Sequence, residues 1–261
     1  MVTTGLLGPV VGWRWTFVMM GVIGVIALLA LVRRRDERPE LHHRPTLAGN
    51  MVALFDAFRK APRAMWASLA IIAAHAHTAT SPFVQLWLIG EKGYGETEAK
   101  AIYGLVFVLA GLAGTFGSGL AGDWAQRRFG LDRAKTVLLT LLLIGPLLPL
   151  YRLAPGGSPL FYAGMVGSIL YMTVLYGPIF AVIEELLPAR LKATSTGLNM
   201  LVINIVAIGA VSYSIGLASE RLVAAGSAHS WTWPLMAADT LALLAIPFPW
   251  LAMRSPRSLA A

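Results

Sequence analysis

The stretch "SPLFYAGMVGSILYMTVLYGPIFAVI" (158–183) contains no Asp, Glu, Lys or Arg. A helix rises about 1.5 Å per residue, so about 20 residues cross a hydrocarbon core of about 30 Å. This stretch is therefore long enough to span a bilayer as a helix. It lacks the alternation of polar and apolar residues over about 10 positions that barrel strands show, which favours a helix over a membrane strand.

Similar apolar stretches recur along the 261-residue chain, which is 57% hydrophobic and 13% charged. A soluble domain carries roughly 25% charged residues. We expect about seven transmembrane helices, at residues 12–32, 65–89, 101–121, 136–153, 158–183, 196–217 and 233–252. The composition therefore predicts an all-α integral membrane protein whose main partner is the lipid bilayer.

Most of the 21 lysines and arginines lie in the links 33–63, 122–135 and 184–195 and in the C-terminal tail. Because basic links concentrate on the cytoplasmic side, the N-terminus is expected outside and the C-terminus in the cytoplasm, in an inner or plasma membrane. The net charge of +8 is compatible with nucleic-acid binding, but its residues sit between apolar spans. We therefore expect no nucleic-acid partner.

The chain has no cysteine, which excludes a disulfide framework and a thiolate metal site. His75 and His77 form an H-x-H pair, but a helix separates their side chains by about 160° and no third ligand is near in sequence. We expect no metal and no cofactor.

Enzyme and retinal-protein interpretations also find little support. "FGSG" (116–119) is similar to the Gly-x-Ser-Gly of rhomboid proteases, but Phe116 stands where that motif needs glycine. The last span has neither a histidine to act as a base nor a lysine to form a Schiff base. The sequence therefore predicts a protein that is not an enzyme.

The long link 33–63 changes character at Thr46. Its first part is charged and broken by prolines, whereas Leu47, Met51, Leu54 and Phe58 recur at helical spacing. This pattern predicts an amphipathic helix on the membrane surface or against helix ends. A simple interfacial connector is the alternative.

The six spans after this link divide into two groups of three. Each group begins with a helix that we expect to be broken by proline, at Ser81-Pro82 in the first and at Gly177-Pro178 in the second. Two similar triplets are typical of transporters built from inverted repeats.

Three stretches resemble parts of the major facilitator superfamily in the right order. "GWRWTFVMMGVIGVIALLALVRRRDERPE" (12–40) resembles the sixth helix of that family, and "GSGLAGDWAQRR" (117–128) resembles its signature between helices 8 and 9. "YGPIFAVIEELLPARLKATSTGL" (176–198) resembles the end of helix 10 and the loop that follows. The second stretch departs from the signature at Trp124 and Gln126, where arginine and glycine are common.

Within the superfamily the chain is most similar to spinster-like transporters. The third stretch, "PFVQLWLIGEKGYGETEAKAIYG" (82–104) and "NMLVINIVAIG" (199–209) carry this resemblance. It implies helices 6 to 12 of a twelve-helix protein: a remnant helix of the N-terminal bundle at 1–32, a cytoplasmic linker at 33–63, and a C-terminal six-helix bundle at 64–261.

The resemblance implies a secondary active transporter that moves a small organic or lipid-like solute by alternating access. Coupling to protons or ions, as symport or antiport, is implied with it, as is a missing N-terminal bundle or second chain as partner. Two alternatives stay open. One is a truncated, non-transporting fragment or a half-transporter that needs a partner, and the other is a seven-helix receptor or scaffold.

Two charged clusters are expected to act as latches between conformations. Small residues before Asp123 let a helix approach closely, and its carboxylate can accept from a helix N-terminus. The latch residues are Gly119, Asp123, Arg127 and Arg128 in one cluster and Glu185 and Arg190 in the other. Plain anchoring of loops by positive charge is the alternative.

Polar residues within spans are costly and tend to face a cavity or another helix. His75, Thr78 and Gln85 share one helix face, and the resemblance places further residues on helices that line a central cavity. The candidate solute-binding residues are His75, Thr78, Gln85, Tyr171, Tyr176, Asn199 and Asn204. Asp239, the only carboxylate well inside a span, is a possible proton site or a structural bond to a neighbouring helix.

Overall fold

The computed structural model describes residues 46–130 and 132–255, together with 12, 14–15, 17–19, 21–26 and 28–29. Five helical segments in these ranges are apolar and long enough to cross a membrane. They cover Glu96–Leu120, Arg133–Leu153, Pro159–Leu186, Ala189–Ala224 and Thr232–Arg254. A shorter apolar helix covers Phe17–Ile26. The all-α membrane architecture is thereby confirmed.

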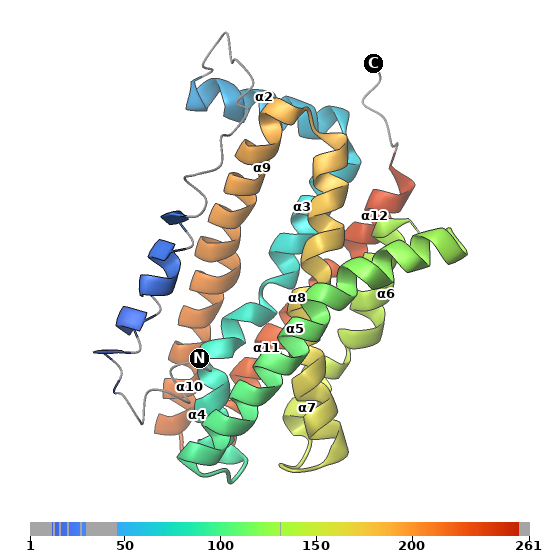
Figure 1. The fold of residues 1–261 in the computed structure, drawn as a ribbon. Helices are drawn as coiled ribbons and strands as arrows, with labels where there is room; N and C mark the ends of the chain where they lie inside the picture. Colours follow the sequence, from blue (N-terminus) through green and yellow to red (C-terminus); the bar gives the residue numbers. More distant parts are fainter. Residues whose placement is uncertain are drawn as a thin grey trace.

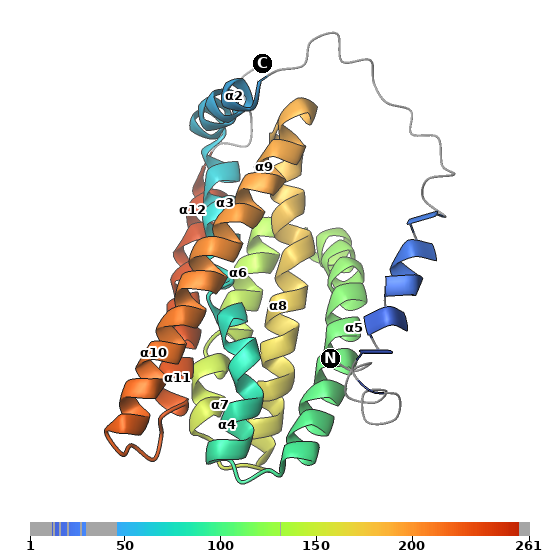
Figure 2. The ribbon, with the colours of Figure 1, turned by 90° about the vertical axis from the view of Figure 1, so that its left-hand side faces the viewer.

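Apart from α2, the helices of the described residues 46–255 run side by side along the bundle, and most of the membrane segments are interrupted (Figures 1 and 2). Their bounds are α5 Glu96–Phe129, α6 Arg133–Ile144, α7 Leu147–Leu153, α8 Pro159–Leu186, α9 Ala189–Val202, η2 Ile203–Ala210, α10 Val211–Ala224, α11 Thr232–Ala242, η3 Leu243–Ala245 and α12 Pro247–Arg254. A π-helical turn, η2, joins α9 to α10.

The stretch 62–91, where a span was expected at 65–89, is built from three short pieces: α3 (Pro62–Ala74), the 3₁₀ segment η1 (His77–Phe83) and α4 (Val84–Glu91). Pro82 lies inside η1 and has no N–H to donate, which favours the predicted break. Two backbone carbonyls at the break accept hydrogen bonds from side chains. The Thr80 hydroxyl donates to His77 O at 2.8 Å, and the Ser212 hydroxyl donates to Ala79 O at 3.2 Å. Irregular backbone is tolerated at membrane depth when neighbours satisfy it in this way.

The second predicted break is wrong. Helix α8 runs through Gly177 and Pro178 without interruption from Pro159 to Leu186. It packs against α3, α5 and α6, and the neighbours of a membrane helix can compensate for the one hydrogen bond that a proline removes.

Two predicted links are also corrected. Helix α5 continues to Phe129, so most of 122–135 is helical, and it ends at Gly130 with a positive φ of 61°. A glycine in this left-handed conformation is a common helix end. In the same way α8 ends at Leu186 and α9 begins at Ala189, so 184–195 is nearly all helix.

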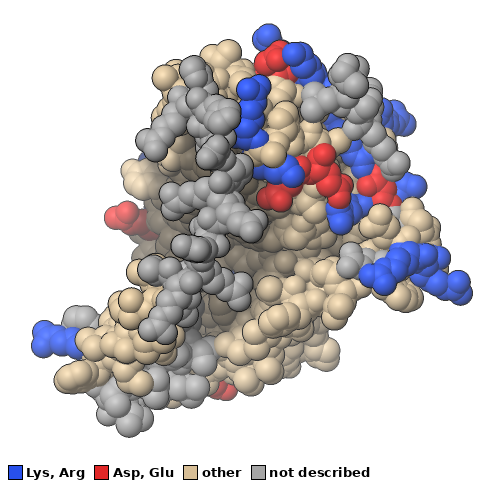
Figure 3. All heavy atoms as spheres, turned by 45° about the horizontal axis from the view of Figure 1, so that its top comes forward, with Lys and Arg blue, Asp and Glu red and all other residues tan. Residues whose placement is uncertain are grey.

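The amphipathic helix expected after Thr46 is confirmed as α2 (Leu47–Lys60), which lies across one end of the bundle (Figure 1). The hydroxyl of Thr46 caps it by accepting from Gly49 N at 3.1 Å. Leu54 and Phe58 are buried against the bundle. Charged side chains gather over this end of the molecule, while much of the flank carries none (Figure 3).

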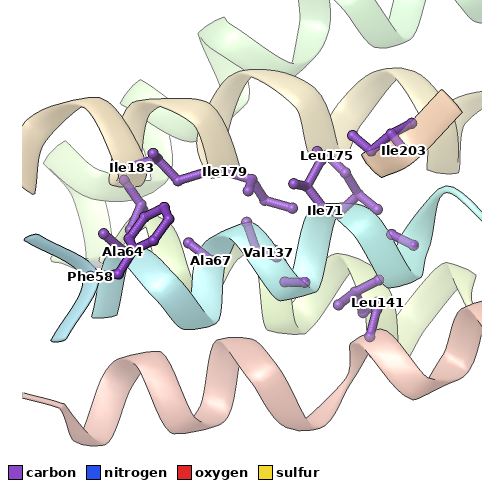
Figure 4. Packing of buried hydrophobic residues seen from close by; sticks show 14 of the residues in the cluster. Phe58, Ala64, Ala67, Ile71, Val137, Leu141, Leu175, Ile179, Ile183 and Ile203 are labelled. Carbon is purple, nitrogen blue, oxygen red and sulfur yellow. The ribbon is translucent and has the colours of Figure 1, made fainter. Parts of the chain in front are cut away.

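The core is built largely from alanine and aliphatic side chains where α3, α6 and α8 meet. Ile71 of α3 and Leu175 and Ile179 of α8 are almost completely buried and face one another (Figure 4). Toward the other end a second cluster forms around Trp87 and Phe161. Here α8 approaches α7 so closely that a Cβ on Gly164 would lie 2.0 Å from Tyr151 Cβ.

Candidate functional site

A cavity of about 1120 Å³ opens beside the break in the 62–91 segment. Its walls come from η1 and the end of α3, from α5, from α8 and from η2. Apolar side chains such as Phe107, Leu112 and Met172 make most of the wall. The polar lining residues in the described part are His75, Thr78, Ser81, Thr115, Ser118, Thr173 and Tyr176.

His75 and Tyr176 form the most distinctive polar contact in this cavity. His75 Nε2 lies 2.9 Å from the Tyr176 hydroxyl, and the two rings meet edge to face at 5.0 Å. His75 Nδ1 lies 2.6 Å from Ile71 O, so that nitrogen carries the hydrogen and donates it. Neutral His75 therefore satisfies both ring nitrogens when its Nε2 accepts from the tyrosine.

The other candidate solute-binding residues divide into two groups. Thr78 lines the cavity together with His75 and Tyr176. Gln85, Tyr171, Asn199 and Asn204 are not among its described lining residues. Tyr171 is buried and its hydroxyl lies 3.3 Å from Ala242 O.

Asn199 and Asn204, both on the 189–224 segment, have different environments. Asn199 is buried and its amide nitrogen donates to the Ser68 hydroxyl at 3.3 Å, which ties α9 to α3. Asn204 is exposed, and its amide donates to Met200 O of its own helix at 2.8 Å.

The residues of the expected latches lie in the C-terminal part of α5, at the end of α8 and at the start of α9. Arg127 and Arg128 surround a shallow pocket of about 370 Å³ with Leu120 and Trp124. The side chain of Asp123 lies outside the described residues, and Gly119 has nothing within 4 Å of where a Cβ would stand.

In the second cluster Glu185 forms an ion pair with Arg133, which links α8 to α6. Arg190 is exposed. Sequence reasoning did not include Arg133 in this cluster.

Asp239 does not stand alone in the membrane. Its Oδ2 accepts from Arg152 Nε at 2.7 Å, and its Oδ1 lies 2.5 Å from His77 Nδ1. Arg152 also donates from Nη2 to the Thr80 hydroxyl at 3.1 Å. These four side chains, at most 2% exposed, join α11, α7 and η1, and we call them the buried network.

Aromatic rings enclose the arginine of the buried network. The guanidinium carbon lies 4.9 Å from the Trp87 ring centre and 4.6 Å from that of Tyr151. Such faces stabilise a desolvated cation. Arg152 stands at the end of the expected span 136–153, and its side chain is completely buried.

A signal for the buried network was present in the sequence. A membrane carboxylate needs a partner, and Arg152 stands directly at the end of an apolar span. Its pairing with Asp239 depends on which helices are neighbours, which the sequence pattern does not specify.

The C-terminal end of the 62–91 segment is held in place by two adjacent residues. The Glu91 carboxylate accepts from the backbone N–H of Trp231 at 2.5 Å and of Thr232 at 3.1 Å, and so caps the start of α11. Lys92 donates to Arg152 O at 2.9 Å and to Ala154 O at 2.7 Å. Partial burial lowers the pKa of Lys92 below its ordinary value.

The sequence model of the Major Facilitator Superfamily matches residues 1–211. This chain belongs to that superfamily. The match covers most of the length, including the resemblances at 12–40, 117–128 and 176–198. Among curated proteins nothing matches this superfamily member.

Two solved structures share the fold of this superfamily member. Both are crystal structures of a bacterial homologue of the human lysosomal transporter Spinster in an inward-facing conformation. The unoccupied form has a TM-score of 0.63 at 21% identity over 93% of this chain, and the occupied form has 0.61 at 19% over 94%. The chain spans only 59% and 58% of the length of those two chains.

Proposed function

We propose that this chain moves a small organic or lipid-like solute across the membrane by alternating access. Membership of the superfamily supports the class of activity. The observation that carries the proposal is the open cavity of about 1120 Å³ beside the η1 break. Broken helices that line a midplane cavity are typical of secondary transporters.

The chemistry of the walls favours an amphipathic solute. Apolar groups make most of the lining, and a few hydroxyls and the His75–Tyr176 pair supply the polar contacts. Pockets of this kind bind apolar bodies and orient them through a small number of polar groups.

A second helical bundle is proposed to close the cavity, with the N-terminus outside and the C-terminus in the cytoplasm. The shorter length of the chain relative to the two solved structures supports such a partner. The pair Glu185–Arg133 then contributes to a latch between conformations. Its test is Glu185→Gln, expected to change the transport rate and leave the amount of folded protein unchanged, whereas equal rates contradict the latch.

The test of transport is uptake into vesicles that contain the purified chain, with a labelled single-chain phospholipid as the probe, with and without a pH gradient. Saturable uptake that is reduced roughly tenfold or more by the double change His75→Ala and Tyr176→Phe supports the proposal. The matched control is Ser214→Ala, which lies outside the described cavity lining, donates to Ala210 O of its own helix and is expected to keep full uptake. No saturable uptake of this probe by the chain alone favours the half-transporter or non-transporting alternatives.

A further inference from the structure

Both ring nitrogens of His77 point at hydrogen-bond acceptors. Nδ1 lies 2.5 Å from Asp239 Oδ1, and Nε2 lies 3.2 Å from the backbone oxygen of Ser168 on α8. A carboxylate paired with arginine and a carbonyl oxygen both accept, so each nitrogen is placed as a donor. Rotating the ring by 180° would put carbon atoms against both oxygens and leave the carboxylate with one partner fewer.

Neutral histidine can donate from only one of its two nitrogens. The bond to the carboxylate is the shorter and is charge-assisted, so Nδ1 keeps its hydrogen in the neutral ring. The Nε2 lone pair then faces the Ser168 oxygen, and this contact becomes a hydrogen bond only when a second proton is added. We propose that His77 is a proton-binding site in which Nε2 takes up an exchangeable proton and donates it to the Ser168 carbonyl.

The charges around His77 make this proton exchangeable. Arg152 and Asp239 sum to zero, so a neutral His77 leaves the network uncharged and a protonated His77 gives it a charge of +1. Burying a net charge is costly, and this cost opposes the gain of the Ser168 hydrogen bond. The two states therefore compete, and the bulk pH shifts the balance between them.

The ionisable groups around His77 come from every neighbouring element. They are His75 on the same segment, Asp239 on α11, Arg152 and Tyr151 on α7, Tyr171 on α8, Tyr103 on α5 and, next to Arg152, Lys92 after α4. The Tyr171 ring meets the His77 ring edge to face at 5.5 Å. Helix α10 contributes the uncharged Ser212. Asp239 is the acid in direct contact with the His77 ring.

The position of His77 links the proton to the cavity. Along η1 and the residues just before it, His75, Thr78 and Ser81 line the cavity, while His77 and Thr80 belong to the buried network. A void of about 10 Å³, roughly the size for one water molecule, lies against His75, Thr78 and Tyr171. A change of charge at His77 therefore acts on the segment that forms one wall of the cavity. Only this last step rests on the proposed transport function.

The decisive experiment is nitrogen NMR of the full chain with ¹⁵N-labelled histidine, in lipid nanodiscs, titrated from about pH 5 to about pH 9. The chain has five histidines. Single changes of His42, His43, His75 and His229 to Gln assign four of the signals and leave the fifth to His77, so that no change at His77 itself is required. The range brackets the ordinary histidine pKa of about 6.5.

The expected result is a His77 signal that changes from imidazolium at the acidic end to the Nδ1–H neutral form at the alkaline end. His75, two residues away, is the internal control, because its partners among the described residues are the Ile71 carbonyl and the Tyr176 hydroxyl, which satisfy it as a neutral ring. A His77 ring that keeps one state throughout, or a neutral form with its hydrogen on Nε2, overturns the proposal. The NMR readout does not involve transport. A chain that fails to transport the probe can therefore still show the His77 titration, and a chain without this titration can still transport the probe.

Discussion

Arg152 Nε lies 2.7 Å from Asp239 Oδ2, and both side chains are completely buried in the bundle. The two residues are 87 positions apart and join α7 to α11. Removing one partner of a buried ion pair leaves an uncompensated charge, which costs more than the pair itself contributes. Single changes at either residue of the pair are therefore expected to be strongly destabilising.

Asp239→Asn is therefore expected to lower the free energy of unfolding by about 3–5 kcal/mol, because Arg152 stays buried without a counter-charge. The measurement is unfolding of the purified chain in detergent by heat or denaturant. The control is Glu96→Gln, which breaks the exposed ion pair with Lys100 and is expected to have no measurable effect. Equal stability of Asp239→Asn and the control contradicts the assignment of the pair.

Gly164→Ala is expected to destabilise the chain by about 1–3 kcal/mol, since the added methyl group overlaps Tyr151 and forces α8 away from α7. The matched control is Gly216→Ala in α10, where nothing lies within 4 Å of the added carbon. Alanine is the better helix former, so the control is expected to gain up to about 1 kcal/mol. The measurement is the unfolding midpoint of each variant. A Gly164→Ala chain that is as stable as the Gly216→Ala control argues against the close packing of α7 and α8.

Glu91→Ala is expected to release the start of α11 and to cost about 0.5–2 kcal/mol, because two backbone N–H groups lose their acceptor. The measurement is hydrogen exchange at Trp231 and Thr232, which should become faster. Glu220→Ala on α10, at an exposed position, serves as control. Unchanged protection of the two amides in Glu91→Ala would show that the carboxylate does not cap the helix.

The pH dependence of stability is expected to carry a contribution from Lys92. Burial lowers the pKa of Lys92, so in the alkaline window just below its ordinary value of about 10.5 the unfolded chain binds more protons at this site than the folded chain. Lys92 therefore makes the free energy of unfolding increase as the pH rises through this window. Thermal unfolding from about pH 8 to about pH 10.5 for wild type and Lys92→Met measures it. A difference between the two that does not change with pH refutes this sign.

Five of the expected membrane segments are found as long apolar helices, because crossing a bilayer requires long apolar runs, as at 158–183. The amphipathic helix after Thr46 and the break at Pro82 were predictable for similarly local reasons, namely apolar spacing and a missing N–H. Pro178 shows the limit of that reasoning. Whether a proline interrupts a helix depends on the neighbours that pack against it, and α8 continues through this one.

The candidate site was predicted less completely for the same reason. His75 and Thr78 share a helix face and both line the cavity, whereas the partner of His75, Tyr176, lies 101 positions away. His77 and Asp239 are separated by 162 positions, and only the folded bundle brings them together. In the sequence Arg152 resembles an ordinary cation at the end of a span. Its burial depends on contacts with the rings of Trp87 and Tyr151, which the sequence pattern does not specify.

If the cavity beside η1 is a water-accessible path for the solute, single-cysteine variants can show it, because the chain itself contains no cysteine. The measurement is the reaction rate of a membrane-impermeant thiol reagent with Thr115→Cys, in the cavity, and with Leu143→Cys on α6, where the leucine is 77% exposed and is expected to face lipid. Fast labelling is expected at position 115 and is slowed by the single-chain phospholipid used as the transport probe, and little labelling is expected at position 143. Labelling at 143 with none at 115 would contradict such a path.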